Sequence, residues 1–257
     1  MIPKTIHYCW FGKNAKPALA LKCMKSWEKR CKGYNLIEWN EDSFDINSAP
    51  EYVRQAYEAK KWAFVTDYVR LQALYYYGGI YMDTDVEVLK SLDDLLRLKG
   101  FSGFEDFTTV PTGIMASEKG HPVIREWMNE YDNKKFVLED GSLNLETNVV
   151  AITRSMKNHG LITNNTLQTI EGFTFYPKDY FCPKSYHDGR IYKTNNTYTI
   201  HHFAGSWKSP EERKEHEKWM RHWKIDRFTR HIKNGVKAIV GENIYIKIKN
   251  IVKDTTN

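Results

Sequence analysis

The sequence predicts an α/β protein with a mostly parallel sheet flanked by helices, and two observations lead to this fold class. First, apolar stretches of strand length alternate along the chain with segments in which apolar residues recur at helical spacing, a pattern typical of parallel strands joined by crossover helices. Second, the 257 residues suffice to bury a substantial core, and no apolar run approaches the roughly 20 residues of a membrane-spanning helix.

The first half of the chain carries the clearest element signals. Aromatic and aliphatic residues recur at helical intervals between Phe64 and Tyr75, and Gly78 is well placed to end that helix. The predicted elements are a strand at 4–12, a helix at 18–30, a strand at 34–41, a helix at 51–79, a strand at 79–89 and a helix at 91–98.

The second half has weaker signals, with no internal repeat and no low-complexity linker. We divide the chain into a main domain over 1–210 and a basic helical C-terminal extension over 211–257. The predicted elements are strands at 100–107 and 112–117, helices at 121–131 and 148–160, a strand at 197–207 and a charged helix at 210–233.

Charge and cysteine content narrow the class of protein. The net charge is +6, and residues 218–253 hold ten Lys or Arg against two acids, which favours an anionic partner. The four cysteines form no CxxC pair and suit a reducing compartment better than a disulfide framework or a zinc site. The N-terminus lacks the pattern of a signal peptide, so we expect a cytoplasmic protein.

Two carboxylates follow the apolar strand at 79–82. Asp83 and Asp85 are two positions apart, so on a strand their side chains point to the same face and repel each other unless a cation lies between them. Ligands of open α/β sheets bind beyond the carboxyl ends of the strands, and Mg²⁺ or Mn²⁺ takes carboxylate and phosphate oxygens there. A DxD motif alone is common by chance, and solvated acids at a strand end are its simpler interpretation.

Other candidate residues favour a binding site over a pair of solvated acids. Asp67 and Arg70 stand at i and i+3 on the helix that leads into the DxD strand; they form either a surface ion pair or part of a binding site. His201 and His202 point to opposite faces if their strand continues, so one of them is a candidate metal ligand. Trp10 is suited to stack on a flat ring, or to pack in the core.

Three segments together resemble a known family, the family 32 glycosyltransferases. They are IPKTIHYCWFG at 2–12, WAFVTDYVRLQALYYYGGIYMDTDVEVL at 62–89 and HHFAGSW at 201–207. Similar proteins are bacterial capsular-polysaccharide transferases, Och1-like mannosyltransferases and, more distantly, glucosylating clostridial toxins. The resemblance covers most of residues 1–95 and implies a GT-A type, Rossmann-like fold, a nucleotide-sugar donor, Mn²⁺ or Mg²⁺, and retention of the anomeric configuration.

The resemblance also implies roles for individual residues around the DxD motif. Asp83 matches the position near the donor ribose and the metal, and Asp85 matches the direct metal ligand. Asp67 and Arg70 match the pair that contacts the sugar and the phosphate, and Tyr81 matches an aromatic residue that contacts the donor.

Further roles are implied outside that segment. Trp10 falls where related enzymes stack the nucleobase, and Asn148 is assigned to the sugar pocket. His202, with Ser206 and Trp207, falls at the C-terminal motif that binds the metal and closes over the diphosphate. His202 is favoured over its neighbour because HFAG resembles the metal-binding histidine segment of related retaining transferases.

The expected reaction breaks the bond between the sugar C1 and the diphosphate, and a metal with Arg70 stabilises the leaving group. Retention arises either through a carboxylate nucleophile, for which Asp67 and Glu146 are the candidates, or by front-face attack, which we favour. The donor sugar is not readable from the sequence. UDP-galactose is our first choice because the chain looks bacterial, with a glycan or lipid-linked acceptor in polysaccharide or glycolipid synthesis.

The C-terminal extension has two interpretations. Trp219 and Trp223 begin an apolar track that Phe228 and Ile232 continue, flanked by basic residues. Such a helix either packs on the catalytic domain or lies on the anionic inner face of a membrane.

Two other functions fit parts of the sequence. A haloacid-dehalogenase-like phosphatase also has an apolar strand followed by DxD, but that family places the motif close to its N-terminus. A basic, aromatic-rich nucleic-acid or glycan-binding module leaves the two aspartates unexplained, and we expect no nucleic-acid partner.

Overall fold

The computed structural model describes residues 1–186, 188–205, 214, 218 and 221. Most of them belong to one compact unit formed by residues 1–185 and 189–207; a second unit comprises residues 186–188 and 208–257. The predicted C-terminal helix lies almost wholly outside the described residues, and the division at residue 210 stays a prediction.

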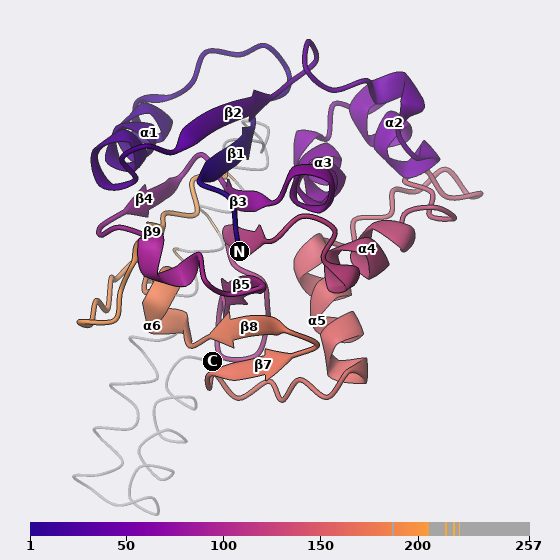
Figure 1. The fold of residues 1–257 in the computed structure, drawn as a ribbon. Coiled ribbons are helices and arrows are strands. Elements are labelled where there is room, and N and C mark those ends of the chain that lie inside the picture. The colour runs from indigo at the N-terminus through magenta and orange to yellow at the C-terminus, as the bar shows by residue number, and fades with distance from the viewer. Residues whose placement is uncertain (187, 206–213, 215–217, 219–220, 222–257) are drawn as a thin grey trace, which may run out of the picture. The chain divides into compact units, whose positions relative to one another are not determined.

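A seven-stranded sheet forms the centre of the first unit (Figure 1). Strands β2, β1, β3, β5 and β8 run in one direction, while β6 and β7 run in the opposite direction, so the predicted α/β class with a mostly parallel sheet is confirmed. In spatial order the strands are β2 (Asn35–Trp39), β1 (Thr5–Cys9), β3 (Gly79–Met82), β6 (Ile114–Ser117), β5 (Gly100–Gly103), β8 (Phe173–Tyr176) and β7 (Gln168–Ile170).

The predicted strand at 79–89 is two strands in two different sheets. β3 ends at Met82, a turn closes with the Val86 amide donating to the Asp83 carbonyl at 3.0 Å, and β4 (Val86–Val88) then pairs antiparallel with β9 (Thr199–His201). Helix α1 holds this two-stranded ribbon: the Trp27 indole N–H donates to the Val86 carbonyl at 2.7 Å. The DxD motif therefore spans the junction between the two sheets.

Helices cover both faces of the main sheet (Figure 1). Along β3 the side chains of Ile80 and Met82 join one core cluster, which includes Trp27 of α1, and Tyr81 joins the other, which includes α3. The helices are α1 (Ala18–Arg30), α2 (Glu51–Glu58), α3 (Trp62–Tyr77), α4 (Pro122–Asn129), α5 (Asn148–Asn158) and α6 (Lys178–Phe181).

Two helix predictions are corrected. The long helix predicted at 51–79 breaks into α2 and α3, because Lys60 adopts a φ of 55° and the Lys61 amide donates back to the Ala56 carbonyl at 2.9 Å, which is a left-handed C-cap without glycine. The helix predicted at 91–98 is a short 3-10 turn at Asp93–Leu95. Elements β7, β8 and α6 were not predicted.

A buried histidine holds the turn between α3 and β3. The ring of His7 is fully buried; its Nδ1 accepts a hydrogen bond from the Trp39 indole at 3.2 Å, and its Nε2 donates to the Gly78 carbonyl at 2.9 Å. A Cβ at Gly79 would lie 2.7 Å from the Thr5 carbonyl oxygen, so only glycine fits this approach. Burial lowers the pKa of His7, and a second proton on Nδ1 would face the Trp39 N–H.

This arrangement predicts a pH-dependent stability. Above the ordinary histidine pKa of 6.5 the ring is neutral in both folded and unfolded chains; below it the unfolded chain binds the proton more readily, so the free energy of unfolding falls as the pH drops. Urea unfolding of the wild type between pH 8 and 5.5 should show this loss, and His7→Gln should show a shallower dependence. His159→Gln, at a partly exposed ring, is the control; equal pH dependence in all three proteins would contradict the prediction.

Candidate active site

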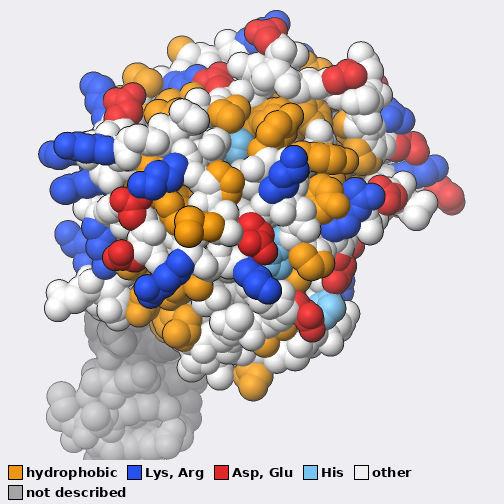
Figure 2. All heavy atoms as spheres, viewed as in Figure 1, with side chains coloured by type: hydrophobic (Ala, Val, Ile, Leu, Met, Phe, Trp, Pro, Cys, Tyr) orange, Lys and Arg blue, Asp and Glu red, His pale blue; other side chains and the backbone are white. Residues whose placement is uncertain are grey.

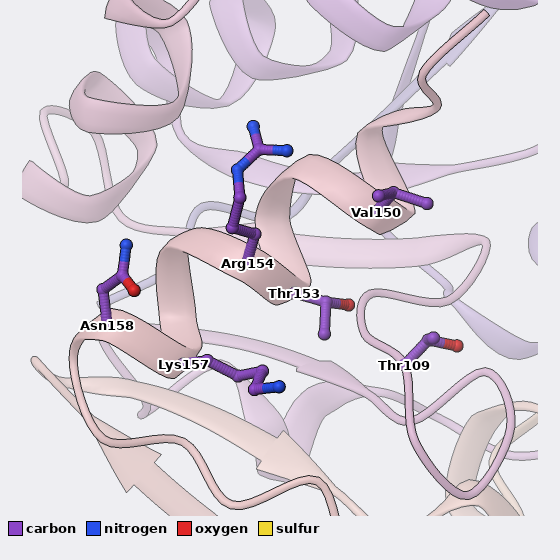
Figure 3. A pocket seen from close by; sticks show the side chains of 6 residues that line it. All are labelled: Thr109, Val150, Thr153, Arg154, Lys157 and Asn158. Carbon is purple, nitrogen blue, oxygen red and sulfur yellow. The ribbon is translucent and has the colours of Figure 1, made fainter.

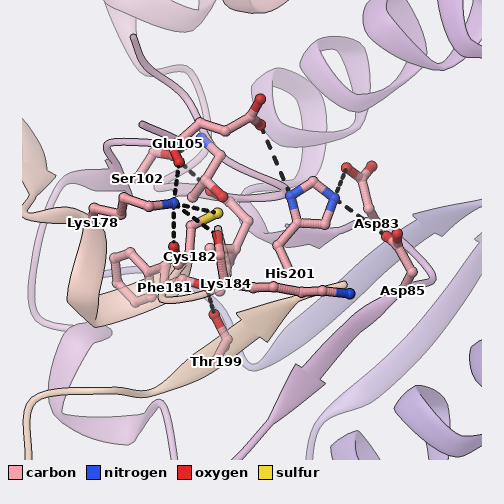
Figure 4. Close-up of polar contacts among 12 residues, drawn as sticks. Asp83, Asp85, Ser102, Glu105, Lys178, Phe181, Cys182, Lys184, Thr199 and His201 are labelled. Atoms are coloured by element: carbon pink, nitrogen blue, oxygen red, sulfur yellow. Dashed lines mark hydrogen bonds and ion pairs between the residues drawn. The ribbon is translucent and has the colours of Figure 1, made fainter. Parts of the chain in front are cut away.

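Asp83, the first aspartate of the motif, is anchored to the main sheet. Its amide donates to the Gly113 carbonyl at 2.8 Å, and its Oδ1 accepts a hydrogen bond from the Tyr81 hydroxyl at 2.9 Å. Arg70 lies 3.4 Å from the same oxygen. One oxygen of Asp83 is thus engaged by the protein, which leaves Oδ2 directed toward His201 at 3.8 Å (Figure 4).

The second aspartate belongs to the ribbon. Asp85 Oδ2 accepts a 2.6 Å hydrogen bond from the Ala204 amide, and Oδ1 lies 3.4 Å from His201 Nε2. Burial opposes ionisation of this carboxyl, but the neighbouring imidazole outweighs it and lowers the pKa of Asp85 to about 2. Asp85 is therefore a carboxylate at neutral pH.

Asp83, Asp85 and His201 form a cluster, which we call the DDH cluster, whose three ligating atoms all lie within 4.8 Å of one another (Figure 4). Two carboxylate oxygens and an imidazole nitrogen suit Mn²⁺, and Mg²⁺ with added oxygen ligands. Gly113 keeps the space beside them open, since a Cβ there would lie 3.0 Å from Asp83 Oδ2 and 3.1 Å from the His201 ring. The residues present thus fit a divalent cation.

The structure places a different histidine beside the two aspartates. The sequence analysis favoured His202, but the imidazole beside the two aspartates belongs to His201. His202, the residue after β9, points away from the two aspartates, and its Nε2 contacts Glu87 Oε2 at 2.8 Å. The expected alternation of the two side chains was right; the choice between them depended on pairing with β4, which one sequence does not reveal.

Asp67 and Arg70 join the cluster from helix α3. Arg70 Nη2 lies 3.3 Å from Asp67 Oδ1, and the guanidinium carbon lies 4.5 Å from the centroid of the Tyr81 ring. Both members of the pair are buried, so the alternative of an exposed surface ion pair is excluded. Burial raises the pKa of Asp67 to about 6, against the opposing effect of Arg70.

The other predicted site residues are placed as follows. The backbone amide of Asn148, the first residue of α5, donates to Asp67 Oδ2 at 3.2 Å, and its buried side-chain amide nitrogen has no partner among the described residues. The Trp10 indole donates to the Asn14 carbonyl at 2.6 Å, and its nucleobase-stacking role stays a prediction. Ser206 and Trp207 lie outside the described residues.

Two residues near the cluster were missed by sequence reasoning. Glu105 places Oε2 3.9 Å from His201 Nδ1 (Figure 4), and Gly113 provides the open space described above. No motif marks either residue, because both reach the site through the loop between β5 and β6. Glu146, a candidate nucleophile, instead pairs with Lys134 at 3.0 Å and with Arg154.

A shallow pocket of about 350 Å³ lies along α5, opposite the loop that carries Thr109 (Figure 3). It is lined by Thr109, Val150, Thr153, Arg154, Lys157 and Asn158, and includes no member of the DDH cluster. Thr153 ties this helix to the loop, because its hydroxyl donates to the Val110 carbonyl at 2.7 Å.

The surface has a mixed character on the side shown in Figure 2, where basic side chains gather at the left edge of the view and acidic ones lie among them. Helix α1 contributes the exposed cations Lys22, Lys25, Lys29 and Arg30. Among the described residues, no helix is both long enough and apolar enough to cross a membrane.

Comparison with known proteins indicates the class of enzyme. Residues 17–101 match the family described as "Glycosyltransferase sugar-binding region containing DXD motif". An uncharacterized glycosyltransferase of Acanthamoeba polyphaga mimivirus is 28% identical over 215 residues, covering 76% of this chain and 82% of the relative. Inositol phosphoceramide mannosyltransferase 3 of Schizosaccharomyces pombe is 31% identical over 127 residues, covering 48% of this chain and 35% of that protein.

Among solved structures, a glycosyltransferase involved in glycosylation of the major capsid of PBCV-1 aligns with 84% of this chain and 98% of its own, at 13% identity and a TM-score of 0.42. The family match and the relatives confirm the predicted enzyme class, a glycosyltransferase, and the match to the DXD-containing region covers residues 17–101. The narrower assignment to family 32 stays a prediction.

Proposed function

We propose that this chain is a metal-dependent, retaining glycosyltransferase of GT-A type that moves a hexose from a nucleotide sugar to a glycan or lipid-linked acceptor. The observation that carries the proposal is the DDH cluster, beside which Asp67 and Arg70 are buried. If Asp83 and Asp85 were only solvated acids at a strand end, they would not need His201, Asp67 and Arg70 beside them. The phosphatase alternative is not favoured, since the side chains of Asp83 and Asp85 are held by Tyr81 and the Ala204 amide.

The proposed chemistry begins with departure of the leaving group. The bond between the sugar C1 and the phosphate oxygen breaks, and its electron pair remains on that oxygen. A divalent cation bound by Asp83, Asp85 and His201 would supply positive charge where negative charge develops on the diphosphate. Arg70 adds fixed positive charge, and its position depends on Asp67 and on the Tyr81 ring.

The acceptor hydroxyl attacks from the face that the diphosphate leaves, so the configuration at C1 is retained. Its oxygen bonds to C1, and its proton passes to the departing phosphate oxygen. This route needs no nucleophile from the protein. It is supported by the pairing of the two candidates: Glu146 is engaged by Lys134 and Arg154, and Asp67 by Arg70 and the Asn148 amide.

The choice of donor and acceptor follows from the character of the sequence and from one relative. UDP-galactose remains the first choice of donor. GDP-mannose is a second candidate, because the S. pombe relative is named a mannosyltransferase, and that same name favours a lipid-linked acceptor. The proposed contact of the C-terminal helix with an anionic membrane concerns residues outside the described ones and rests on their basic, tryptophan-containing pattern.

A donor panel tests the proposal. The full chain is incubated with UDP-galactose, UDP-N-acetylgalactosamine, UDP-glucose or GDP-mannose, with Mn²⁺ or with EDTA, and release of the nucleoside diphosphate is measured. We expect one donor to be cleaved with Mn²⁺ and none with EDTA. Full activity in EDTA would refute the metal assignment, and hydrolysis of a simple aryl phosphate with no donor cleaved would favour the phosphatase.

A further inference from the structure

The ring of His201 lies between carboxylates on both sides (Figure 4). Nε2 faces the cluster, 3.4 Å from Asp85 Oδ1 and 3.8 Å from Asp83 Oδ2. Nδ1, on the opposite side of the ring, lies 3.9 Å from Glu105 Oε2 and is a buried atom without a hydrogen-bond partner in the described part of the chain. The proposed function uses Nε2 and leaves Nδ1 unexplained.

The Glu105 backbone is held in place by its own loop. Its amide donates to the Thr109 carbonyl at 2.9 Å, and the next residue, Asp106, accepts hydrogen bonds from the amides of Thr108 and Thr109 at 2.6 and 2.8 Å. These contacts close a tight turn immediately after Glu105. The carboxylate is thus presented toward His201 by a backbone that the turn constrains.

Lys178 secures the same loop from a second direction. Its ammonium donates to the Glu105 carbonyl at 2.6 Å, and also to the carbonyls of Cys182 at 2.6 Å and Lys184 at 3.0 Å (Figure 4). Lys184 in turn donates to the His202 carbonyl at 2.6 Å. A chain of contacts therefore connects the loop of Glu105 to the strand that carries His201.

We propose that Glu105 is a positioning residue that accepts a hydrogen bond from Nδ1–H of His201 and so presents Nε2 to the divalent cation. A histidine that binds a cation through one ring nitrogen carries its proton on the other, and a carboxylate acceptor fixes that tautomer and the ring orientation. The 3.9 Å separation exceeds a hydrogen bond by about 1 Å, which rotation of the partly exposed carboxylate can close. Glu105 lies across the ring from both aspartates, so it is not itself a fourth ligand of the cluster.

This inference rests on the proposed metal site, and the affinity for Mn²⁺ tests it without any turnover. Mn²⁺ is titrated into the full chain in the absence of nucleotide sugar, and free Mn²⁺ is followed by electron paramagnetic resonance. The proteins are the wild type, Glu105→Ala, Glu105→Gln and the control Glu139→Gln, which changes an exposed glutamate. Thermal unfolding in EDTA compares the folded state of each protein in the absence of metal.

Glu105→Ala is expected to raise the Kd for Mn²⁺ about tenfold to a hundredfold, the usual cost of losing an outer carboxylate. Glu105→Gln keeps an oxygen acceptor but not the charge, so its Kd should fall between those of the wild type and Glu105→Ala, while Glu139→Gln matches the wild type. If Glu105→Ala does not fold, a Kd for Glu105→Gln equal to the wild type overturns the inference. It is also overturned if Glu105→Ala binds Mn²⁺ as the wild type does, or if the two Glu105 variants weaken binding equally. A wild type that binds no Mn²⁺ would overturn the metal site and the inference with it.

Discussion

An Asp85→Asn enzyme is expected to turn over its nucleotide-sugar donor about a hundredfold to a thousandfold more slowly than the wild type. Asparagine has nearly the same shape as aspartate and keeps a side-chain oxygen that can accept a hydrogen bond from the Ala204 amide, so the ribbon should stay in place. What is lost is the anionic oxygen 3.4 Å from His201 Nε2, and with it the charge that holds the cation. Initial rates at saturating Mn²⁺ measure the effect.

Glu87→Gln is the matched control for this experiment. Glu87 lies two residues further along the same ribbon, and its carboxylate pairs with His202 and Lys22 rather than with the DDH cluster. The control removes the same charge from the neighbouring strand β4 and should keep most of the activity. Similar losses in both variants would mean that the ribbon's net charge matters, and the assignment of Asp85 as a metal ligand would then be wrong.

Replacing Arg70 with methionine is expected to lower the free energy of unfolding by about 3–5 kcal/mol at pH 7. This is the usual cost of removing one partner of a buried ion pair, because the charge of the other partner stays buried without compensation. The guanidinium lies between Asp67 and Asp83, at 3.3 and 3.4 Å, and all three groups have limited access to water. Methionine fills much of the volume but leaves two carboxylates facing each other. Arg70→Lys should be intermediate, because it keeps the charge and loses the planar fork. Urea unfolding measures both variants.

Arg125→Met provides the comparison. Arg125 also places its guanidinium over a tyrosine, 5.3 Å from the centroid of the Tyr75 ring, but it is exposed and forms no ion pair among the described residues. Its replacement should cost less than about 1 kcal/mol. If Arg70→Met unfolds at the same urea concentration as the wild type, the buried carboxylates do not depend on this cation.

Local signals predicted the elements well where a periodic pattern coincided with a cap or a glycine. Helix α1 has the predicted bounds, 18–30, and Gly78 ends α3 as expected. The break at Lys60 was missed because a lysine in the left-handed region carries no sequence mark, and the hydrophobic spacing continues across it. Strand β8 was missed because it pairs with β5 across a long separation in sequence, and β7 was missed with it because this three-residue strand pairs with β8 in a short hairpin.

The candidate site was predictable where its residues follow one another in the chain. Asp83, Asp85, Asp67 and Arg70 come together because α3 leads directly into β3. Choosing His201 required knowledge of the β4–β9 pairing, and finding Glu105 required the loop that Lys178 fastens. Contacts of this kind depend on tertiary pairing, which the pattern of a single sequence does not encode.

The DxD motif lies at the junction of two sheets, so its two carboxylates are held by different parts of the fold. Asp83 is held by the main sheet, whereas Asp85 and His201 are held by the ribbon, which α1 contacts through Trp27. A cation bound by all three residues would connect the main sheet to the ribbon. Any displacement of the ribbon relative to the main sheet would then change the distances between the ligating atoms. Substitutions on the buried side of α1, which supplies no ligand itself, would then lower the activity by shifting the ribbon.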